Sequence, residues 1–144
     1  MGERAGPRSE LDRLRLVVAE RLGRGELPEV VYMDYLVQLV EMLNAVYLAL
    51  EPERRPLFYR TFEELVARYF AAYLGLPPPD VRFYEMTPRE YVERVFQYTY
   101  GVLKGRVPAQ SEHERRRGVE LRTALTLVKA LELMLRLTAP REVA

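Results

Sequence analysis

Arginine is the residue type in this sequence whose number and spacing could do chemistry, and that chemistry would be phosphate binding. Only Lys104 and Lys129 are lysine, so 20 of the 22 basic residues are arginine. The planar guanidinium donates paired hydrogen bonds to phosphate oxygens, and counterion release along a nucleic acid adds salt-dependent affinity. Two segments are rich in arginine, residues 1–25 and residues 104–122. The candidate nucleic-acid contacts in them are Arg4, Arg8, Arg13, Arg15, Arg21, Arg24, Arg115, Arg116, Arg117 and Arg122.

Both arginine segments also have an interpretation without nucleic acid. Arg115, Arg116 and Arg117 are consecutive, and consecutive helical residues point about 100° apart. They would therefore grip a curved surface or reach separate partners, instead of forming one flat patch. Neighbouring glutamates could equally neutralise them on a solvated helix face. The first segment starts with Gly- and Pro-containing residues, a composition that favours a flexible basic arm.

Groups for catalysis or metal binding are scarce in the sequence. It has no cysteine, and His113 is the single histidine. These absences exclude thiolate nucleophiles, cysteine-ligated metals and a multi-histidine metal site within one chain. The glycine-rich phosphate loops are missing, and the two serines, Ser9 and Ser111, fit helix caps. We therefore predict a protein that is not an enzyme and needs no cofactor or metal, with a hydrolase built only from Asp and Glu as the alternative.

Apolar residues recur at helical spacing in five segments, which predicts an all-α fold. The expected helices run from Ser9 to about Leu22, from Pro28 to about Leu50, from Pro52 or Pro56 to Gly75, from Pro88 to about Lys104, and from Ser111 to about Thr138. Three consecutive prolines prevent a helix after Leu76, so we expect an ordered loop there. Thr87, with Pro88 next and Glu90 three residues on, predicts a capping box.

We expect the four longer helices to form a bundle, with the first helix as an arm. Residues 1–27 would be the basic N-terminal arm with one amphipathic helix, residues 28–139 the helical bundle, and residues 140–144 a mobile tail. The N-terminus lacks the apolar stretch of a signal peptide. The most apolar window, residues 30–50, carries Asp34, Gln38 and Glu41 on one helical face, which argues against a lipid-spanning helix.

The formal charge of +1 conceals a separation of charge along the chain. Residues 26–53 contain six acidic and no basic residues, whereas residues 1–25 sum to +2 and residues 104–122 to +3. The acidic segment could face the basic arm of a neighbouring copy, and this complementarity would favour self-assembly. It could also be neutralised within the chain. The sequence leaves both interpretations open.

The chain resembles the major capsid proteins of filamentous viruses of hyperthermophilic archaea. The resemblance lies in the chain length, in the basic helical N-terminal region ahead of an apolar bundle, and in a composition rich in Glu and Arg but poor in Asn and Gln. The apolar segments that carry it are residues 32–50, 57–74, 91–103 and 119–137.

This resemblance implies a structural protein that coats and packages double-stranded DNA without sequence specificity in a helical filament, the virion. The candidate arginines would contact phosphates and not bases. The implied partners are the DNA backbone, copies of the chain itself and a related second capsid subunit, with no small-molecule substrate and no transmembrane segment. The implied location is the virion, assembled in the host cell, and otherwise the cytoplasm.

Two other classes of protein remain open at this point. A small helical subunit of a CRISPR ribonucleoprotein effector would bind single strands or a guide–target heteroduplex within a multiprotein complex. A helical protein–protein adaptor would bind another chain through its apolar stripes and would show no salt-dependent binding of nucleic acid. Filaments that protect duplex DNA would distinguish the capsid protein from both.

Overall fold

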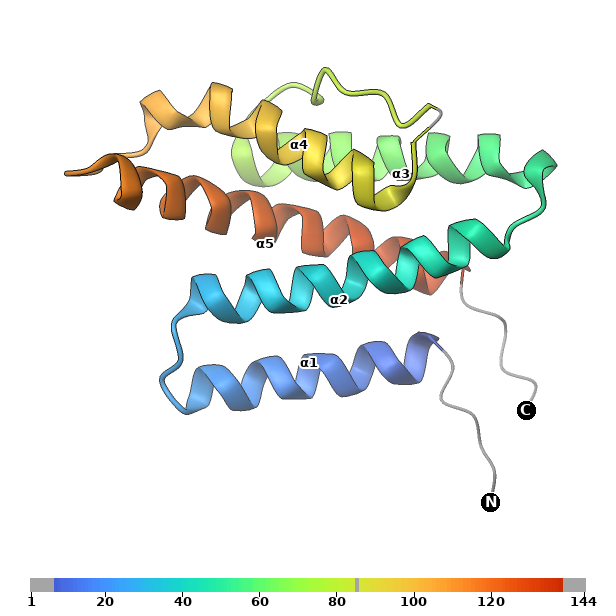
Figure 1. Cartoon of the computed structure of the whole chain (residues 1–144), viewed down its shortest axis with the longest axis horizontal. Helices are drawn as coiled ribbons and strands as arrows, with labels where there is room; N and C mark the ends of the chain where they lie inside the picture. The colour runs from blue at the N-terminus through green and yellow to red at the C-terminus, as the bar shows by residue number, and fades with distance from the viewer. Residues whose placement is uncertain (1–6, 85, 139–144) are drawn as a thin grey trace.

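The computed structural model describes residues 7–84 and 86–138, and it confirms the predicted all-helical fold (Figure 1). The α-helices are α1 (Pro7–Gly23), α2 (Pro28–Ala49), α3 (Arg55–Tyr69), α4 (Pro88–Leu103) and α5 (Glu112–Thr138). Short helical turns accompany them: η1 (Pro52–Arg54) precedes α3, η2 (Phe70–Leu74) continues it, and η3 (Lys104–Arg106) follows α4. The described residues contain no β-strand.

The ends of the helices lie close to where prolines and capping residues predict them. Pro28 and Pro88 occupy the first positions of α2 and α4. The capping box before α4 is formed: the Glu90 N–H donates to Thr87 Oγ1 at 3.3 Å, and the Thr87 N–H donates to Glu90 Oε1 at 3.4 Å. Gly75 ends η2 with a φ of 62°, a conformation that glycine adopts without strain. The first helix begins at Pro7, two residues before the expected start at Ser9.

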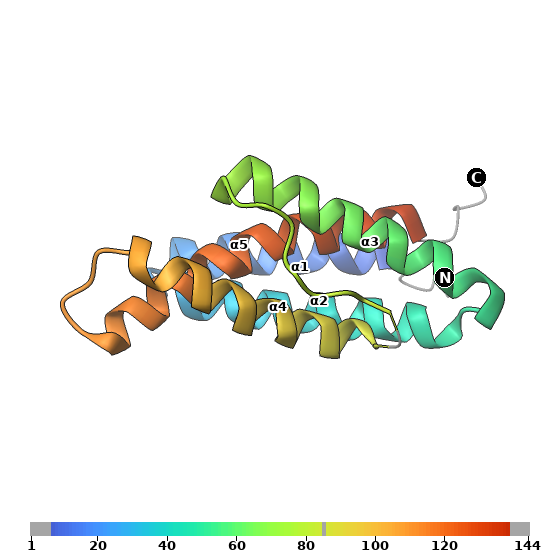
Figure 2. The same cartoon turned by 90° about the horizontal axis from the view of Figure 1, so that it is seen from above.

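Helix α5 lies at the centre of the bundle and contacts each of the other four helices. In Figure 1, α1 and α2 lie on one side of α5, and α3 and α4 lie on the other. Seen from above in Figure 2, the connection from α3 to α4 crosses the bundle. The position of α5 explains its length, because it must supply packing surface to helices on several sides.

The N-terminal arm is not confirmed as a separate part of the fold. Helix α1 packs against α2 and α5, and its side chains Leu11 and Leu14 are only 0% and 3% exposed. The predicted tail, residues 140–144, lies outside the described residues. Within the described part of the chain, the first helix is therefore a fifth member of the bundle.

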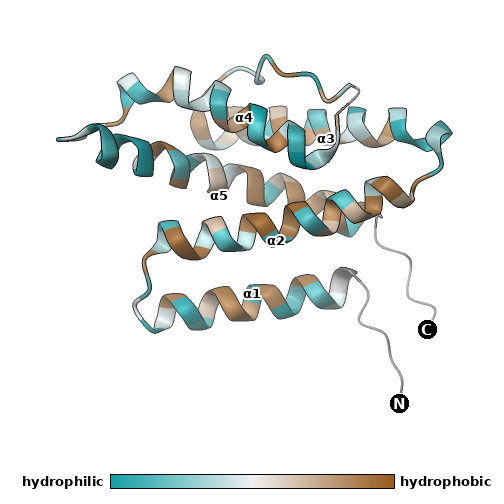
Figure 3. Cartoon of the chain, in the orientation of Figure 1, coloured by the Kyte–Doolittle hydropathy of each residue, from teal (hydrophilic) through white to brown (hydrophobic). Residues whose placement is uncertain are grey.

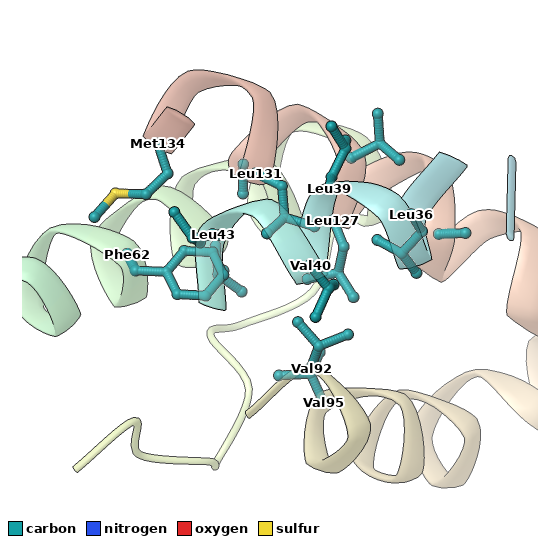
Figure 4. Packing of buried hydrophobic residues seen from close by; sticks show 14 of the residues in the cluster. Leu36, Leu39, Val40, Leu43, Phe62, Val92, Val95, Leu127, Leu131 and Met134 are labelled. Atoms are coloured by element: carbon teal, nitrogen blue, oxygen red, sulfur yellow. The ribbon is translucent and has the colours of Figure 1, made fainter. Parts of the chain in front are cut away.

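The core forms where the apolar faces of the helices meet. Figure 4 shows Leu39 and Leu43 of α2 close to Leu127 and Leu131 of α5. Each fully buried aliphatic side chain of this kind contributes about 1.5–3 kcal/mol relative to an exposed one. Figure 3 shows that α5 changes along its length, from a hydrophilic N-terminal part to a more hydrophobic remainder.

The core face of the third helix shifts at its end, away from the face that the apolar spacing predicts. The apolar spacing places Tyr73 on the stripe of Phe58 and Phe62, but Tyr73 is exposed, while Phe70 is fully buried. The π-helical turn of η2 explains this difference, since a wider turn shifts the face that points to the core. Exposed Tyr73 instead stacks on Tyr69, with ring centroids 5.6 Å apart.

Among the described residues, no single helix is both long and apolar enough to cross a membrane. Helix α2 and the segment Pro52–Leu74 meet that criterion only as a pair, and the pair is bent by 120° at its break.

Candidate nucleic-acid interface

The end of α1 and the start of α5, which carry parts of the two arginine-rich segments, lie at the same end of the bundle (Figure 1). The turn between α1 and α2 lies at the left of Figure 1, as do η3 and the start of α5. The Arg117 guanidinium is 3.7 Å from a Glu29 carboxylate oxygen, so the start of α5 contacts the start of α2 directly. We call this region the basic end; its cations are Arg21, Arg24, Lys104, Arg106, Arg115, Arg116 and Arg117.

Within the basic end, Arg21 is held by two carboxylates of the same chain. Its side chain is only 21% exposed, and its nitrogens are 2.8 Å from Glu26 and 2.9 Å from Asp34. The hydrogen bond from Arg21, with a smaller contribution from Arg24, lowers the pKa of the Glu26 carboxyl below its ordinary value. Arg21 therefore links α1 to the start of α2, and a phosphate would have to compete with two carboxylates for it.

Three other arginines of the basic end have weaker partners. Arg24 pairs with Glu26 at 3.2 Å and Arg115 with Glu112 at 2.9 Å, while the Arg116 guanidinium lies 4.8 Å from the centre of the Tyr100 ring. Ion pairs at the surface of a protein contribute only about 0–1 kcal/mol, because water and salt screen both charges. These arginines can therefore exchange a carboxylate for a phosphate at little cost.

Lys104 and Arg106 belong to the basic end, although the sequence did not single them out as candidate contacts. Both side chains are exposed, and neither makes an ion pair with any residue that the structure describes. Lys104 Nζ lies 5.9 Å from the centre of the Tyr100 ring. Their place in the same basic stretch as Arg115 was the sequence signal that could have identified them.

The structure does not bring all ten candidate arginines together. Arg13 pairs with Glu10 on α1, and Arg15 lies 3.6 Å from Glu132 of α5. Arg122 is on α5 beside Lys129, in a groove next to η2 and not at the basic end. Arg4 and the side chain of Arg8 lie outside the described part of the structure.

Folding neutralises most of the acidic segment within the chain. Glu26 and Asp34 bind Arg21, and Glu29 faces Arg117. Farther along α2, Glu41 accepts two hydrogen bonds from Arg89, at 2.9 and 2.6 Å. Of the two interpretations of this segment, neutralisation within the chain therefore describes four of its six carboxylates.

Two further carboxylates have structural contacts. Glu63 accepts a hydrogen bond of 2.6 Å from the Phe83 N–H and so fastens the loop before α4 to α3. Glu132, which is 8% exposed, accepts a hydrogen bond of 2.5 Å from the Tyr35 hydroxyl. The described residues contain no group of three or more His, Cys, Asp or Glu side chains that could hold a metal ion.

No protein-family model, no curated protein and no solved structure matches the chain.

Proposed function

We propose that the protein is a structural, non-enzymatic coat protein. It binds double-stranded DNA through the phosphate backbone and assembles with copies of itself into a helical filament, as the capsid of a virion does. The observation that carries the proposal is the basic end, where parts of two arginine-rich segments far apart in the sequence lie at the same end of the bundle. A related second capsid subunit is compatible with the same mode of assembly.

Binding at the basic end would follow from the weakness of its internal contacts. Exposed Lys104 and Arg106 are available directly, and Arg24 and Arg115 can exchange their surface ion pairs for phosphate oxygens. Arg116 keeps its contact with Tyr100 while its guanidinium edge remains open to a second partner. Contacts of this kind read the backbone and not the bases, which suits a protein that must coat any sequence.

The test is the salt dependence of binding to duplex DNA, measured by fluorescence anisotropy. The triple variant Arg115→Gln, Arg116→Gln, Arg117→Gln should lower the slope of log affinity against log salt by about 0.9 for each phosphate that is no longer bound. A matched control removes three exposed arginines of the α3 region, in the variant Arg54→Gln, Arg60→Gln, Arg68→Gln, and should keep the slope. An equal loss in both variants would reject the basic end as the binding surface.

Electron microscopy of the protein mixed with duplex DNA tests the second half of the proposal. Regular helical filaments are the expected result. Protein that remains dispersed on duplex DNA but binds a single strand or an RNA–DNA heteroduplex would instead favour a CRISPR effector subunit.

A protein–protein adaptor is the second candidate function. The observation in its favour is the apolar groove between α2 and α4, together with the internal pairing of several candidate arginines. It predicts that the protein binds no DNA in a salt-dependent way, so the anisotropy series separates the two candidates.

A further inference from the structure

An apolar groove with an acidic rim lies between α2 and α4. It encloses about 510 Å³, and Leu36, Val40, Val92 and Phe96 line it. Four charged side chains surround it: Glu41, Arg89, Glu93 and Glu120. Glu41 and Arg89 bind each other, and Glu93 interacts with Arg89 at longer range, so three carboxylates and one guanidinium leave the groove with an excess of negative charge. We call this the acidic groove.

A second apolar groove has a basic rim. It encloses about 480 Å³ between η2, the end of α4 and the middle of α5. Its apolar lining residues are Tyr73, Leu74, Leu103 and Leu125. The charged residues along it are Arg122 and Lys129, which make no ion pair within the described part of the chain, and it has no acidic lining residue. We call this the basic groove.

The two grooves open on different sides of α5. Glu120 lines the acidic groove and Arg122 lines the basic groove, and these residues are two positions apart on one helix. Two positions correspond to a rotation of about 200°, so the side chains point in nearly opposite directions. An excess of carboxylates thus lies on one side of α5, and two cations lie on the other.

We propose that the acidic groove of one copy binds the basic groove of the next. Exposed apolar side chains accompany both charged rims, Val37 at the acidic groove and Tyr73 and Leu125 at the basic groove, so the contact would combine apolar burial with opposite charges. Because the two surfaces differ and lie on opposite sides, the contact is heterologous. Such a contact repeats from copy to copy and builds a ring if the rotation between copies closes, and an open helical filament if it does not. The open filament is the form that the proposed coat function requires.

This inference rests on the proposed self-assembly and names the surfaces that would carry it. The acidic groove is separate from the ion pairs at the basic end, and Arg122 belongs to the contact between copies and not to the DNA-binding surface. Assembly and DNA binding can therefore be tested separately.

The experiment is a pair of charge reversals, with sedimentation measured in the absence of nucleic acid. The variant Arg122→Glu, Lys129→Glu gives the protein two acidic grooves, and the variant Glu93→Lys, Glu120→Lys gives it two basic grooves. Each alone should associate at least about tenfold more weakly than the unmodified protein, since like charges then face each other. Mixed in equal amounts, the two variants should associate again, because every groove then finds a groove of opposite charge.

Two controls reverse charges outside both grooves: Arg54→Glu with Arg60→Glu, and Glu53→Lys with Glu64→Lys. They should associate as the unmodified protein does, and circular dichroism verifies that all variants keep their helix content. The inference is overturned if the groove variants associate as strongly as the unmodified protein, or if the mixture stays dissociated. It is also overturned if the unmodified protein remains monomeric, which is the result expected if a different protein occupies the grooves or an amphiphilic anion occupies the basic groove.

Anisotropy with duplex DNA on the unmodified protein separates this inference from the proposed function. The protein could bind DNA in a salt-dependent way and form filaments on it while charge reversal leaves association unchanged. This result would reject the contact between the grooves and retain the proposed coat function. If the protein binds no DNA but the mixed variants associate again, the proposed coat function is rejected and the contact between copies is retained.

Discussion

Helix α1 and the loop before α4 are attached to the bundle in contrasting ways. Besides buried Leu11 and Leu14 and partly buried Val18, α1 is held by charged contacts. They run from Arg15 to Glu132 and from Arg21 to Glu26 and Asp34. The loop is attached mainly by an aromatic side chain, Phe83, which is fully buried and whose N–H also donates to Glu63. Five rings surround it with centroids 5.2–6.0 Å away: Tyr47, Phe58, Tyr59, Phe62 and Tyr91.

This difference determines how each region responds to solution conditions. Aromatic packing depends on buried area and ring geometry, so salt and pH change it little. Ion pairs at a partly exposed surface are screened by salt and disappear when the carboxylate is protonated. We therefore expect the loop to open only when the whole bundle unfolds, and α1 to open locally at a lower free energy.

Replacing Phe83 by alanine should produce the largest effect. It removes the ring at the centre of the aromatic cluster and leaves a cavity, which typically costs about 3–5 kcal/mol of the free energy of unfolding. Denaturant unfolding followed by circular dichroism measures this loss, which should be the same at low and high salt. Phe83→Leu fills part of the cavity and should lose less; a loss below about 1 kcal/mol for Phe83→Ala would mean that the cluster does not hold the loop.

Tyr35→Phe should have the second largest effect, on the side of the molecule where α1 packs. Burial raises the pKa of the Tyr35 hydroxyl far above its ordinary value, and the hydrogen bond to Glu132 adds to this shift, so the hydroxyl remains a donor at every physiological pH. The variant removes a hydrogen bond to a charged group and should cost about 1.5–3 kcal/mol in denaturant unfolding.

A second substitution sharpens this prediction. In Tyr35→Phe with Glu132→Leu, no unpaired carboxylate is left in the site, so part of the missing stability should return. If the double variant is less stable than Tyr35→Phe, the carboxylate has another stabilising partner, and Arg15 at 3.6 Å is the obvious one.

Thr87→Ala should have a smaller effect, again near the loop. It removes the side-chain cap of α4 that the Glu90 N–H and carboxylate share, at a typical cost of about 1 kcal/mol. Thr87→Ser keeps the oxygen and should stay close to the unmodified protein in the same unfolding measurement. An equal loss in both variants would assign the effect to the Thr87 methyl group instead of the cap.

The helices could be predicted from the sequence because their signals are local. Pro28, Pro88 and the Thr87 cap act on residues within one turn, and apolar spacing identifies the faces that are buried. The π-helical turn at Phe70 could not be predicted, because it interrupts that spacing without a proline or glycine inside it. Phe83 lies in an ordered loop, as predicted, but the rings around it come from α2, α3 and α4, which no local pattern brings together.

The candidate site was harder to predict, because the order of charged residues along a sequence does not say which of them lie together in the folded protein. The six arginines of residues 1–25 form one segment, yet Arg13 and Arg15 contact Glu10 and Glu132 while Arg21 is held by two carboxylates. Parts of the two basic segments lie at the same end of the bundle only because α1 and α2 form a hairpin whose turn lies beside the start of α5. Such an arrangement depends on how whole helices pack, and no spacing between residues encodes it.

Glu26→Gln should give the smallest effect and should distinguish α1 from the loop most directly. The hydrogen bonds from Arg21 and Arg24 lower the pKa of Glu26 below its ordinary value of 4.5, so the ionised carboxylate stabilises the folded protein. This contribution is fully present above pH 4.5 and is lost as the pH falls through the lower folded pKa. In hydrogen exchange, corrected for the intrinsic effect of pH, the α1 amides of the unmodified protein should therefore lose protection in acid and at high salt. The α4 amides should lose less, because buried Tyr91 and Val95 hold α4 in addition to its own Arg89–Glu41 pair. Glu26→Gln should make the protection of α1 depend less on pH and on salt, with Asp34 left as the remaining partner of Arg21. The control Glu53→Gln changes an exposed position without an ion pair among the described residues, and it should leave both dependences intact. Equal sensitivity of α1 and α4 in the unmodified protein would show that charge does not distinguish the two attachments.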